Sequence, residues 1–327
     1  MIFSVCIREN EVFTKHASWE TELKRMREKG VNIIFPYIND FDFPVEKLCA
    51  LAKAAGIEVY PWIKPAFAVQ NPYLRCLEND DLKLQKELFT TEIRRPCMND
   101  NRNTDAGLDN IHKFIDKHKN HLTGLMLDYV RNDNALFLKR FPCQCAVCQE
   151  ARKPWLGHGV LTAVDMANPA VIYKELELRN QSTTAFVQSV RKMTNEAGLK
   201  LTMAARANYV NQPDIEEPPV FGLGPSVYEG QDWHAWAKQG LFDFICTMNY
   251  HTDTEMYRDV VREHQRLLAG TGADFHSGIG LSSSMGHASP ELVKKLANIA
   301  KENGATGCMI FHWGGVDDSY DAFGADI

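Results

Sequence analysis

Asp128 is the residue whose position most clearly indicates chemistry, because it directly follows the apolar run Gly-Leu-Met-Leu at residues 124–127. A carboxylate at the end of an apolar strand can serve as a nucleophile or as a general base. Arg131, three residues further on, is the candidate cation beside it. The alternative interpretation is structural: Asp128 would pair with Arg131 or cap a loop and take no part in a reaction.

A second carboxylate is needed if the chemistry is hydrolysis of a glycosidic bond, because one group acts as acid and the other as nucleophile or base. Glu229 and Asp232 lie in the segment Tyr-Glu-Gly-Gln-Asp-Trp at residues 228–233. Asp232 directly precedes an amphipathic stretch, where aspartate is an ordinary helix N-cap. Glu229 precedes a glycine outside that stretch, so we expect Glu229 to be the general acid. Asp232 is the alternative partner of Asp128, and Asp40 is the third candidate.

Polar and aromatic residues recur at the ends of the predicted strands. Such a mixture suits a sugar site, because the apolar faces of a pyranose stack on aromatic rings while its hydroxyls need fixed donors and acceptors. The substrate-contacting residues expected on this ground are Arg8, Tyr37, Asn39, Trp62, Lys64, Arg131, Asn208, Asn249, Tyr250, His312 and Trp313. Among them, Trp62, Tyr250 and Trp313 are the expected stacking surfaces.

Cys143, Cys145 and Cys148 form a cluster of the kind that can bind a metal. Three thiols are one ligand short of structural zinc, and no histidine is nearer than His158. The spacing also differs from the Cys-x-x-x-Cys-x-x-Cys of radical-SAM barrels. We therefore expect no metal and no cofactor, and the simplest interpretation is a loop with reduced thiols. Structural zinc is the less favoured alternative, and a disulfide would apply if the protein is exported.

A scaffold must bring these residues together, and the sequence predicts a parallel one. Eight short apolar runs rich in β-branched and aromatic residues alternate with amphipathic stretches. This alternation indicates a parallel sheet that helices cover on both faces. Eight repeats favour closure into a TIM (β/α)8 barrel, with the site at the carboxyl ends of the strands. The expected strands are residues 2–7, 32–38, 58–64, 124–130, 200–206, 242–249, 276–281 and 307–313.

The predicted barrel is a single domain over residues 1–327. Long βα loops follow its third, fourth and fifth strands. Its final helix is shortened, because only fourteen residues follow Trp313. The structural alternative is a doubly wound open sheet, which is disfavoured because no Gly-x-Gly-x-x-Gly turn follows the first strand.

The composition excludes several classes of partner. With 36 Lys and Arg against 42 Asp and Glu, the formal charge is -6, which leaves no basic excess for nucleic acid. No apolar run approaches the roughly 18 residues of a membrane span, and no signal-peptide pattern opens the chain. Nine cysteines, an odd number, fit a reducing compartment. We therefore expect a cytoplasmic protein unless a leader has been removed, and the sequence does not predict its oligomeric state.

Two segments are similar to a known family. GLMLDYVR at residues 124–131 resembles the G-I-H-L-D-Y-V-R segment of the glycosyl-hydrolase-like family 10 barrels. QDWHAW at residues 231–236 resembles the same family's Q-D-W-x-x-W. Gly240, Asp243 and the Met-Asn-Tyr at residues 248–250 continue that second series.

The resemblance implies a TIM barrel that acts on carbohydrate, with Asp128 as the leading catalytic residue. The residues that it places near the sugar are Asp232, Trp233, Asn249 and Tyr250. Weaker matches at residues 95–99 and 177–180 add Asn99 and Arg179 to the expected binding residues.

Residues and resemblance together predict a glycoside hydrolase acting on a polysaccharide or oligosaccharide through an oxocarbenium-like transition state. Asp128 is the expected nucleophile or base, Glu229 is the expected acid, and Trp233 joins the stacking surfaces. The alternative function is a carbohydrate-binding barrel without activity, because carboxylates are scarce at the other strand ends. A third hypothesis is a metal-dependent enzyme that uses the cysteine loop.

Overall fold

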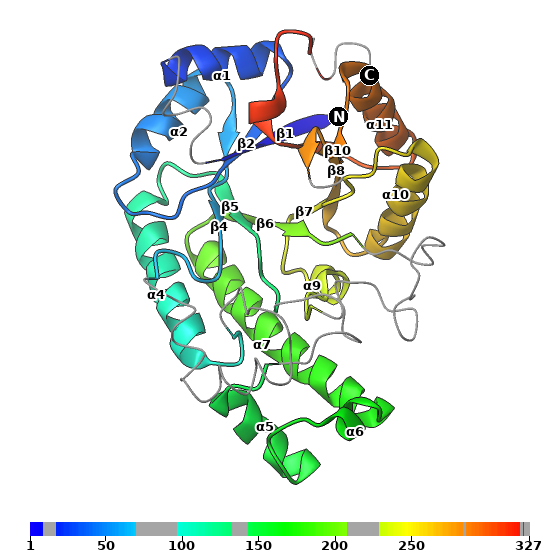
Figure 1. Ribbon diagram of the computed structural model, residues 1–327. Helices are drawn as coiled ribbons and strands as arrows, with labels where there is room; N and C mark the ends of the chain where they lie inside the picture. Colours follow the sequence, from blue (N-terminus) through cyan, green and yellow to red (C-terminus); the bar gives the residue numbers. More distant parts are fainter. Residues whose placement is uncertain are drawn as a thin grey trace.

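Parallel strands alternate with helices along the chain in the computed structural model (Figure 1). The structure describes residues 1–8, 18–69, 97–132, 143–207, 229–283, 286–320 and 323. The parallel sheet consists of β1 (Ile2–Ile7), β2 (Ile33–Pro36), β3 (Glu58–Val59), β4 (Trp62–Ile63), β5 (Gly124–Leu127), β6 (Lys200–Ala205), β7 (Phe244–Thr247), β8 (Asp274–Gly280) and β11 (Gly307–Phe311). A separate antiparallel pair consists of β9 (Ser282–Ser283) and β10 (Gly286–His287).

The sheet closes on itself through a third barrel strand that is interrupted at Tyr60 and Pro61. Its first half, β3, pairs with β2, and its second half, β4, pairs with β5. Backbone hydrogen bonds continue across the interruption. On one side Tyr60 N donates to Ile34 O at 3.0 Å, and on the other Met126 N donates to Pro61 O at 2.9 Å. Because β3 and β4 act as one strand, the barrel has eight, and the predicted TIM fold is confirmed.

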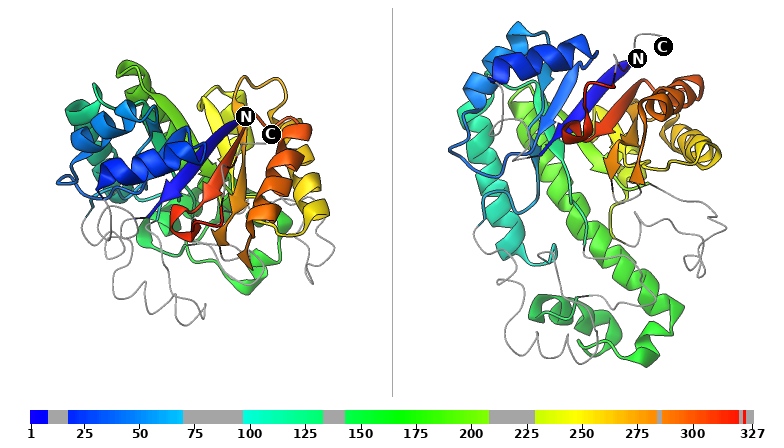
Figure 2. Two further views of the ribbon diagram at one scale, coloured as in Figure 1. Left: turned by 90° about the horizontal axis from the view of Figure 1, so that it is seen from above. Right: turned by 45° about the horizontal axis from the view of Figure 1, so that its top comes forward.

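Helices cover the outside of the barrel (Figure 2). The helices that return the chain to the start of the next strand are α1 (Trp19–Glu28), α2 (Val45–Ala54), α4 (Asn101–His118), α7 (Pro169–Glu196), α9 (Trp233–Lys238), α10 (Thr254–Leu268) and α11 (Pro290–Glu302). Two further helices, α5 (Ala146–Leu156) and α6 (Ala163–Met166), lie at the end of α7 far from β6 (Figures 1 and 2). No helix in the described part of the chain has the length and apolar character needed to span a bilayer.

Capping side chains determine where the helices begin. Ser18 Oγ accepts from the N–H of Thr21 in α1, and Ser289 Oγ accepts from that of Leu292 in α11, each at 3.3 Å. These bonds satisfy amide groups that have no partner within the helix. The other helices with a side-chain N-cap are α4, α7, α9 and α10, and their caps are Asp100, Asn168, Asp232 and Asp253.

Two apolar layers hold the barrel together. The larger lies between the strands and the helices, and the smaller fills the barrel interior. On β5, Leu125 and Leu127 belong to the outer layer whereas Met126 belongs to the inner one. Successive side chains of a strand point to opposite faces, so a strand that is buried on both faces is apolar throughout. This is the physical reason why the strands are visible in the sequence.

The described chain after β11 forms only the short 3-10 helix η3 (Trp313–Gly315), which confirms the shortened final helix. Two aromatic residues cover this sector of the barrel. Phe323 stacks on Phe3 of β1 with 6.1 Å between ring centroids, and its N–H donates to Lys29 O at 2.8 Å. The Tyr320 hydroxyl donates to the carbonyl oxygen of Ala288.

His276 on β8 makes the stability of the barrel depend on pH. Its ring is 2% exposed, lies 4.6 Å from the Phe244 ring between centroids, and has a pKa that burial lowers from 6.5 to about 4. The unfolded chain therefore binds a proton between pH 6.5 and pH 4 that the folded chain does not bind. We expect stability to fall as the pH drops through this window, by about 3 kcal/mol at its lower end.

Urea unfolding of the wild type and of His276→Gln at several pH values between 7 and 4 checks this expectation. Glutamine does not titrate, so the variant should lose less of its unfolding free energy on acidification than the wild type. Equal pH dependence in the two proteins would show that His276 is not the group responsible.

Candidate active site

Asp128, Arg131 and Glu229 form a buried charge cluster at the carboxyl ends of the barrel strands. Arg131 Nη1 lies 3.6 Å from Asp128 Oδ1, and Arg131 Nε lies 3.3 Å from Glu229 Oε2. None of the three residues is more than 7% exposed. A second guanidinium group, that of Arg206, has its Nε 3.3 Å from Glu229 Oε2. The structure thus brings together the two carboxylates expected to act as a pair, with one cation between them.

A tight turn after β5 directs Arg131 back toward Asp128. The N–H of Asp128 donates to Ile63 O on β4 at 2.9 Å, which fixes the residue at the end of the sheet. Tyr129 then adopts φ of 59°, in the left-handed region that is uncommon for residues other than glycine. Its N–H donates to Asp128 Oδ1 at 2.6 Å, and its carbonyl accepts from the N–H of Arg131 at 2.8 Å. The backbone itself therefore holds the ion pair in place.

Gln231 fixes the loop that carries Glu229. Its side chain is fully buried and joins two strand ends, because Oε1 accepts from Arg206 N at 2.6 Å and Nε2 donates to Val130 O at 3.2 Å. Gly230, between Glu229 and Gln231, has φ of 70°, a conformation that glycine adopts without strain. The Gln-Asp-Trp motif thus has an architectural role beside the charge cluster.

The two ion pairs of Arg131 limit the separation of the two carboxylates. Since Asp128 and Glu229 contact the same guanidinium group, their nearest oxygens lie no more than about 9 Å apart. The two carboxyl groups of glycosidases are roughly 5 to 5.5 Å apart in retaining enzymes and roughly 6.5 to 9.5 Å apart in inverting ones. The pair therefore lies within the upper limit of separation for a two-carboxylate mechanism.

Aromatic rings line the mouth of the barrel. Tyr37 and Trp62 meet edge to face with 5.2 Å between centroids, and Tyr250 stacks on Phe311 at 5.2 Å. Trp62 and Phe311, 6.2 Å apart, connect the two pairs. Burial raises the pKa of Tyr250, so its hydroxyl stays protonated and can donate a hydrogen bond. Tyr37, Tyr250 and Phe311 are half-buried and offer an apolar surface of the kind on which a pyranose stacks. Trp62 is only 7% exposed and packs against Tyr37 and Phe311, so it has little free surface for a sugar.

Two cations border these rings. Lys64 Nζ lies 4.4 Å from the centroid of the Tyr37 ring and 4.8 Å from that of Tyr129. The guanidinium carbon of Arg8 lies 4.9 Å from the centroid of the Phe311 ring. Both cations can donate hydrogen bonds to hydroxyl or acidic groups of a carbohydrate.

Three other predicted residues serve the scaffold. Asp232 caps α9, where its Oδ1 accepts from a backbone N–H of the first turn at 3.2 Å. Trp233 is fully buried and donates from Nε1 to Arg206 O at 3.0 Å. Trp313 is 2% exposed and donates to Glu22 Oε2 at 3.1 Å. The core covers the ring faces of both tryptophans, which corrects the expectation that a sugar stacks on them.

The remaining strand-end predictions have varied surroundings. Asn249 is fully buried and donates to Ser277 Oγ at 3.0 Å. His312 is 6% exposed, and Asn39 is exposed, with its side chain accepting a backbone hydrogen bond from the loop after β4. Asn208 lies outside the described residues.

Asn99 and Arg179 lie outside the charge cluster, in the structure that packs against it. Asn99 Nδ2 donates to Cys148 Sγ at 3.2 Å, so it lies beside the cysteine cluster. Burial lowers the pKa of Arg179, a 6% exposed residue of α7. A Cβ on Gly230 would lie 3.0 Å from the carbonyl oxygen of Arg179, which shows that α7 packs directly against the loop of Glu229.

Phe311 is an aromatic residue of the barrel mouth that the sequence analysis missed. The signal was present, because Phe311 lies two positions after Met309, which faces the barrel interior. Alternation along a strand places residues i and i+2 on the same face. The expected contacts instead began one residue later, at His312.

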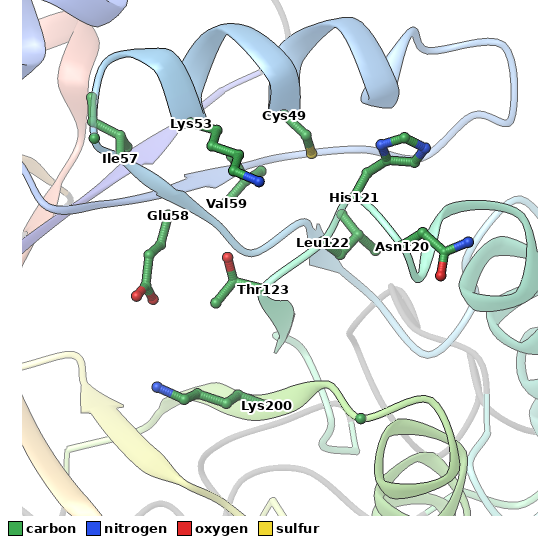
Figure 3. A pocket seen from close by; sticks show the side chains of 12 residues that line it. Cys49, Lys53, Ile57, Glu58, Val59, Asn120, His121, Leu122, Thr123 and Lys200 are labelled. Atoms are coloured by element: carbon green, nitrogen blue, oxygen red, sulfur yellow. The ribbon is translucent and has the colours of Figure 1, made fainter.

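A cavity of about 590 Å³ lies at the opposite end of the same barrel (Figure 3). Glu58 begins β3, Thr123 precedes β5 and Lys200 begins β6, so the cavity is at the amino ends of these strands. Active sites of such barrels lie at the carboxyl ends. The cavity is therefore separate from the charge cluster.

Comparison with known proteins supports the fold. The glycoside hydrolase domain of PgaB (BpsB) from Bordetella bronchiseptica matches with a TM-score of 0.68 and 12% identity, over 98% of this chain and 95% of that one. A chitinase from Chromobacterium violaceum matches with a TM-score of 0.53 and 11% identity, over 98% and 96%. The spore cortex-lytic enzyme SleL from Bacillus megaterium matches with a TM-score of 0.52 and 12% identity, over 97% and 71%.

No family model and no curated protein sequence matches the chain. The similarity to the solved structures shows the fold, which is a barrel like that of the glycoside hydrolases among them. Membership of glycosyl-hydrolase-like family 10 is not shown by these comparisons.

Arg131→Ala should destabilise the protein, because it leaves the buried Asp128 carboxylate without its cation and leaves Glu229 with Arg206 alone. Removing one partner of a buried ion pair costs about 3 to 5 kcal/mol of unfolding free energy. Urea denaturation at neutral pH measures this loss. The control is Lys24→Ala on α1, which breaks an exposed pair with Glu28 and should have far less effect. Similar losses in both variants would contradict a central role for Arg131.

Proposed function

We propose that the protein is a glycoside hydrolase that acts on a polysaccharide or oligosaccharide. The observation that carries the proposal is the pair of buried carboxylates, Asp128 and Glu229, held by one arginine at the carboxyl ends of the barrel strands. The aromatic rings at the barrel mouth supply an adjacent surface for a sugar. The segments at residues 124–131 and 231–236 support a relationship to glycosyl-hydrolase-like family 10.

In the proposed reaction, Glu229 is the general acid and Asp128 is the nucleophile or base. Glu229 gives a proton to the glycosidic oxygen as the bond from that oxygen to the anomeric carbon breaks. Asp128 either attacks the anomeric carbon or removes a proton from the attacking water. Negative charge close to the anomeric carbon stabilises the oxocarbenium-like transition state. Arg131 keeps both carboxylates in position before the substrate binds.

The proteins of similar structure guide the choice of substrate. Four are named as chitinases and one as a spore cortex-lytic enzyme. These names support a long structural polysaccharide as the substrate of this chain as well. Chitin, chito-oligosaccharides and isolated spore cortex are therefore the first substrates to test, with release of reducing ends as the assay.

A second candidate function, carbohydrate binding without cleavage, is favoured by the charges around Glu229. Two guanidinium groups, those of Arg131 and Arg206, lie 3.3 Å from Glu229 Oε2, so in the resting structure this carboxylate is engaged in ion pairs instead of facing a substrate. A barrel of this kind would bind oligosaccharides with saturation in calorimetry and would release no reducing ends. Product formation at a steady rate would remove this alternative.

Asp128→Asn should lower kcat by about two to four orders of magnitude, because an amide can neither attack carbon nor accept a proton. The thermal midpoint should stay within a few degrees, since asparagine has nearly the same size and Arg131 keeps Glu229. Reducing-end release and thermal unfolding of the same preparation measure both effects. Normal turnover in Asp128→Asn would refute the assignment.

Glu229→Gln and Asp232→Asn distinguish the two candidate acids. Asparagine is as good an N-cap as aspartate, so Asp232→Asn should keep both stability and activity. Glu229→Gln should lose activity on natural substrates but keep much of it on aryl glycosides, whose good leaving groups depart without a proton. If Asp232→Asn shows that pattern and Glu229→Gln does not, Asp232 is the acid.

A further inference from the structure

Cys97, Cys143, Cys145 and Cys148 lie together where α4, α5 and the first half of α7 meet. Their four Sγ atoms are all within 4.8 Å of one another, and those of Cys97 and Cys148 are 3.5 Å apart. Cys97 comes from the segment before α4, 46 positions before Cys143. Cys97 thus supplies the fourth thiol that Cys143, Cys145 and Cys148 lack for a four-ligand metal site.

The arrangement has the dimensions of a tetrahedral metal site. A Zn–S bond of about 2.3 Å places the sulfurs of a four-cysteine site about 3.8 Å from one another. The Cys97–Cys148 separation of 3.5 Å and the upper limit of 4.8 Å for all pairs lie on either side of that distance, and no disulfide joins any two of these four cysteines. Four thiolates in a tetrahedral arrangement favour zinc over magnesium or calcium, which prefer oxygen ligands.

The groups around the sulfurs suit metal ligation. Cys145 is the N-cap of α5 and Cys148 lies in its first turn, where the helix dipole stabilises negative charge. Asn99 Nδ2 donates to Cys148 Sγ at 3.2 Å, and the Ser182 hydroxyl donates to Asn99 Oδ1, which orients the amide. Hydrogen bonds of this kind hold metal ligands in position.

Arg152 holds the loop that carries Cys143 in place and brings a positive charge close to the cysteines. Its side chain is fully buried, and its Nε donates to Glu175 Oε1 at 2.6 Å. Its Nη1 donates to Gln144 Oε1 at 3.0 Å, and its Nη2 donates to the carbonyl oxygen of Cys143. Arg179 is a second buried cation near the same thiols. Two arginines and Glu175 leave one net positive charge, which would offset half of the −2 charge of a zinc ion with four thiolates.

We propose that these four cysteines bind one Zn²⁺ ion in a structural site. The protein fills all four positions around the metal, so neither water nor substrate has a place on it and it takes no part in hydrolysis. The ion joins the segment before α4 to the start of α5, and Asn99 extends the link to Ser182 of α7. The next residue, Thr183, donates to Gly230 O beside Glu229, so the site stabilises the wall behind the charge cluster.

Metal analysis of the purified chain of residues 1–327, produced with zinc and without chelators, tests the proposal. We expect about one zinc per chain in the wild type and less than about a tenth in Cys97→Ser or Cys148→Ser. The matched control is Cys49→Ser, which changes a buried thiol on α2 outside the cluster and should keep its zinc. A wild type without zinc, both as purified and after dialysis against zinc chloride, would overturn the proposal.

Two measurements on the wild type keep the test valid if the variants fold poorly. Co²⁺ in place of zinc should give sulfur-to-metal charge-transfer bands and the strong visible bands of tetrahedral thiolate coordination, and weak octahedral bands would contradict the site. After chelation and denaturation without reductant, all nine cysteines should react with a thiol reagent. Seven reactive thiols would reveal a disulfide in place of the metal and would refute the proposal.

Discussion

Closure of the barrel is the constraint on which the rest of the structure depends, and the third strand provides it. Tyr60 and Pro61 interrupt that strand, yet its two halves pair with β2 on one side and β5 on the other. Closure leaves no open sheet edge among the barrel strands and brings all carboxyl ends to one rim. Residues far apart in the sequence, such as Asp128 and Glu229, therefore meet over a filled interior.

The rim combines rigid backbone with opposed charges. The left-handed turn at Tyr129 and the hydrogen bonds of Gln231 hold the buried ion pairs, so the carboxylates do not depend on flexible loops for their position. Preorganised charge of this kind stabilises a transition state without reorganisation during the reaction. The same arginines contact both carboxylates in the resting structure, so under the proposed mechanism a bound sugar has to displace these contacts.

Much of the fold was predictable because strands buried on both faces carry a continuous apolar signal. Asp128 was visible because it ends such a strand. Ring direction was not predictable: Trp233 and Trp313 are apolar residues near strand ends, and the same pattern results whether a ring faces a sugar or the core. The approach of Cys97 to the other cysteines was also hidden, because no local rule relates residues separated by a long loop.

The outside of the barrel is covered differently where β11 pairs with β1 than at the other strands. Elsewhere a helix covers the outside of the strands, but in the described chain Tyr320 and Phe323 cover the place where the last strand meets the first. Opening this sector separates two aromatic side chains from the wall, whereas opening any other sector detaches an entire amphipathic helix. We therefore expect local unfolding of the barrel to begin where its two ends join, with amide hydrogens of β1 and β11 exchanging before those of β6 and β7.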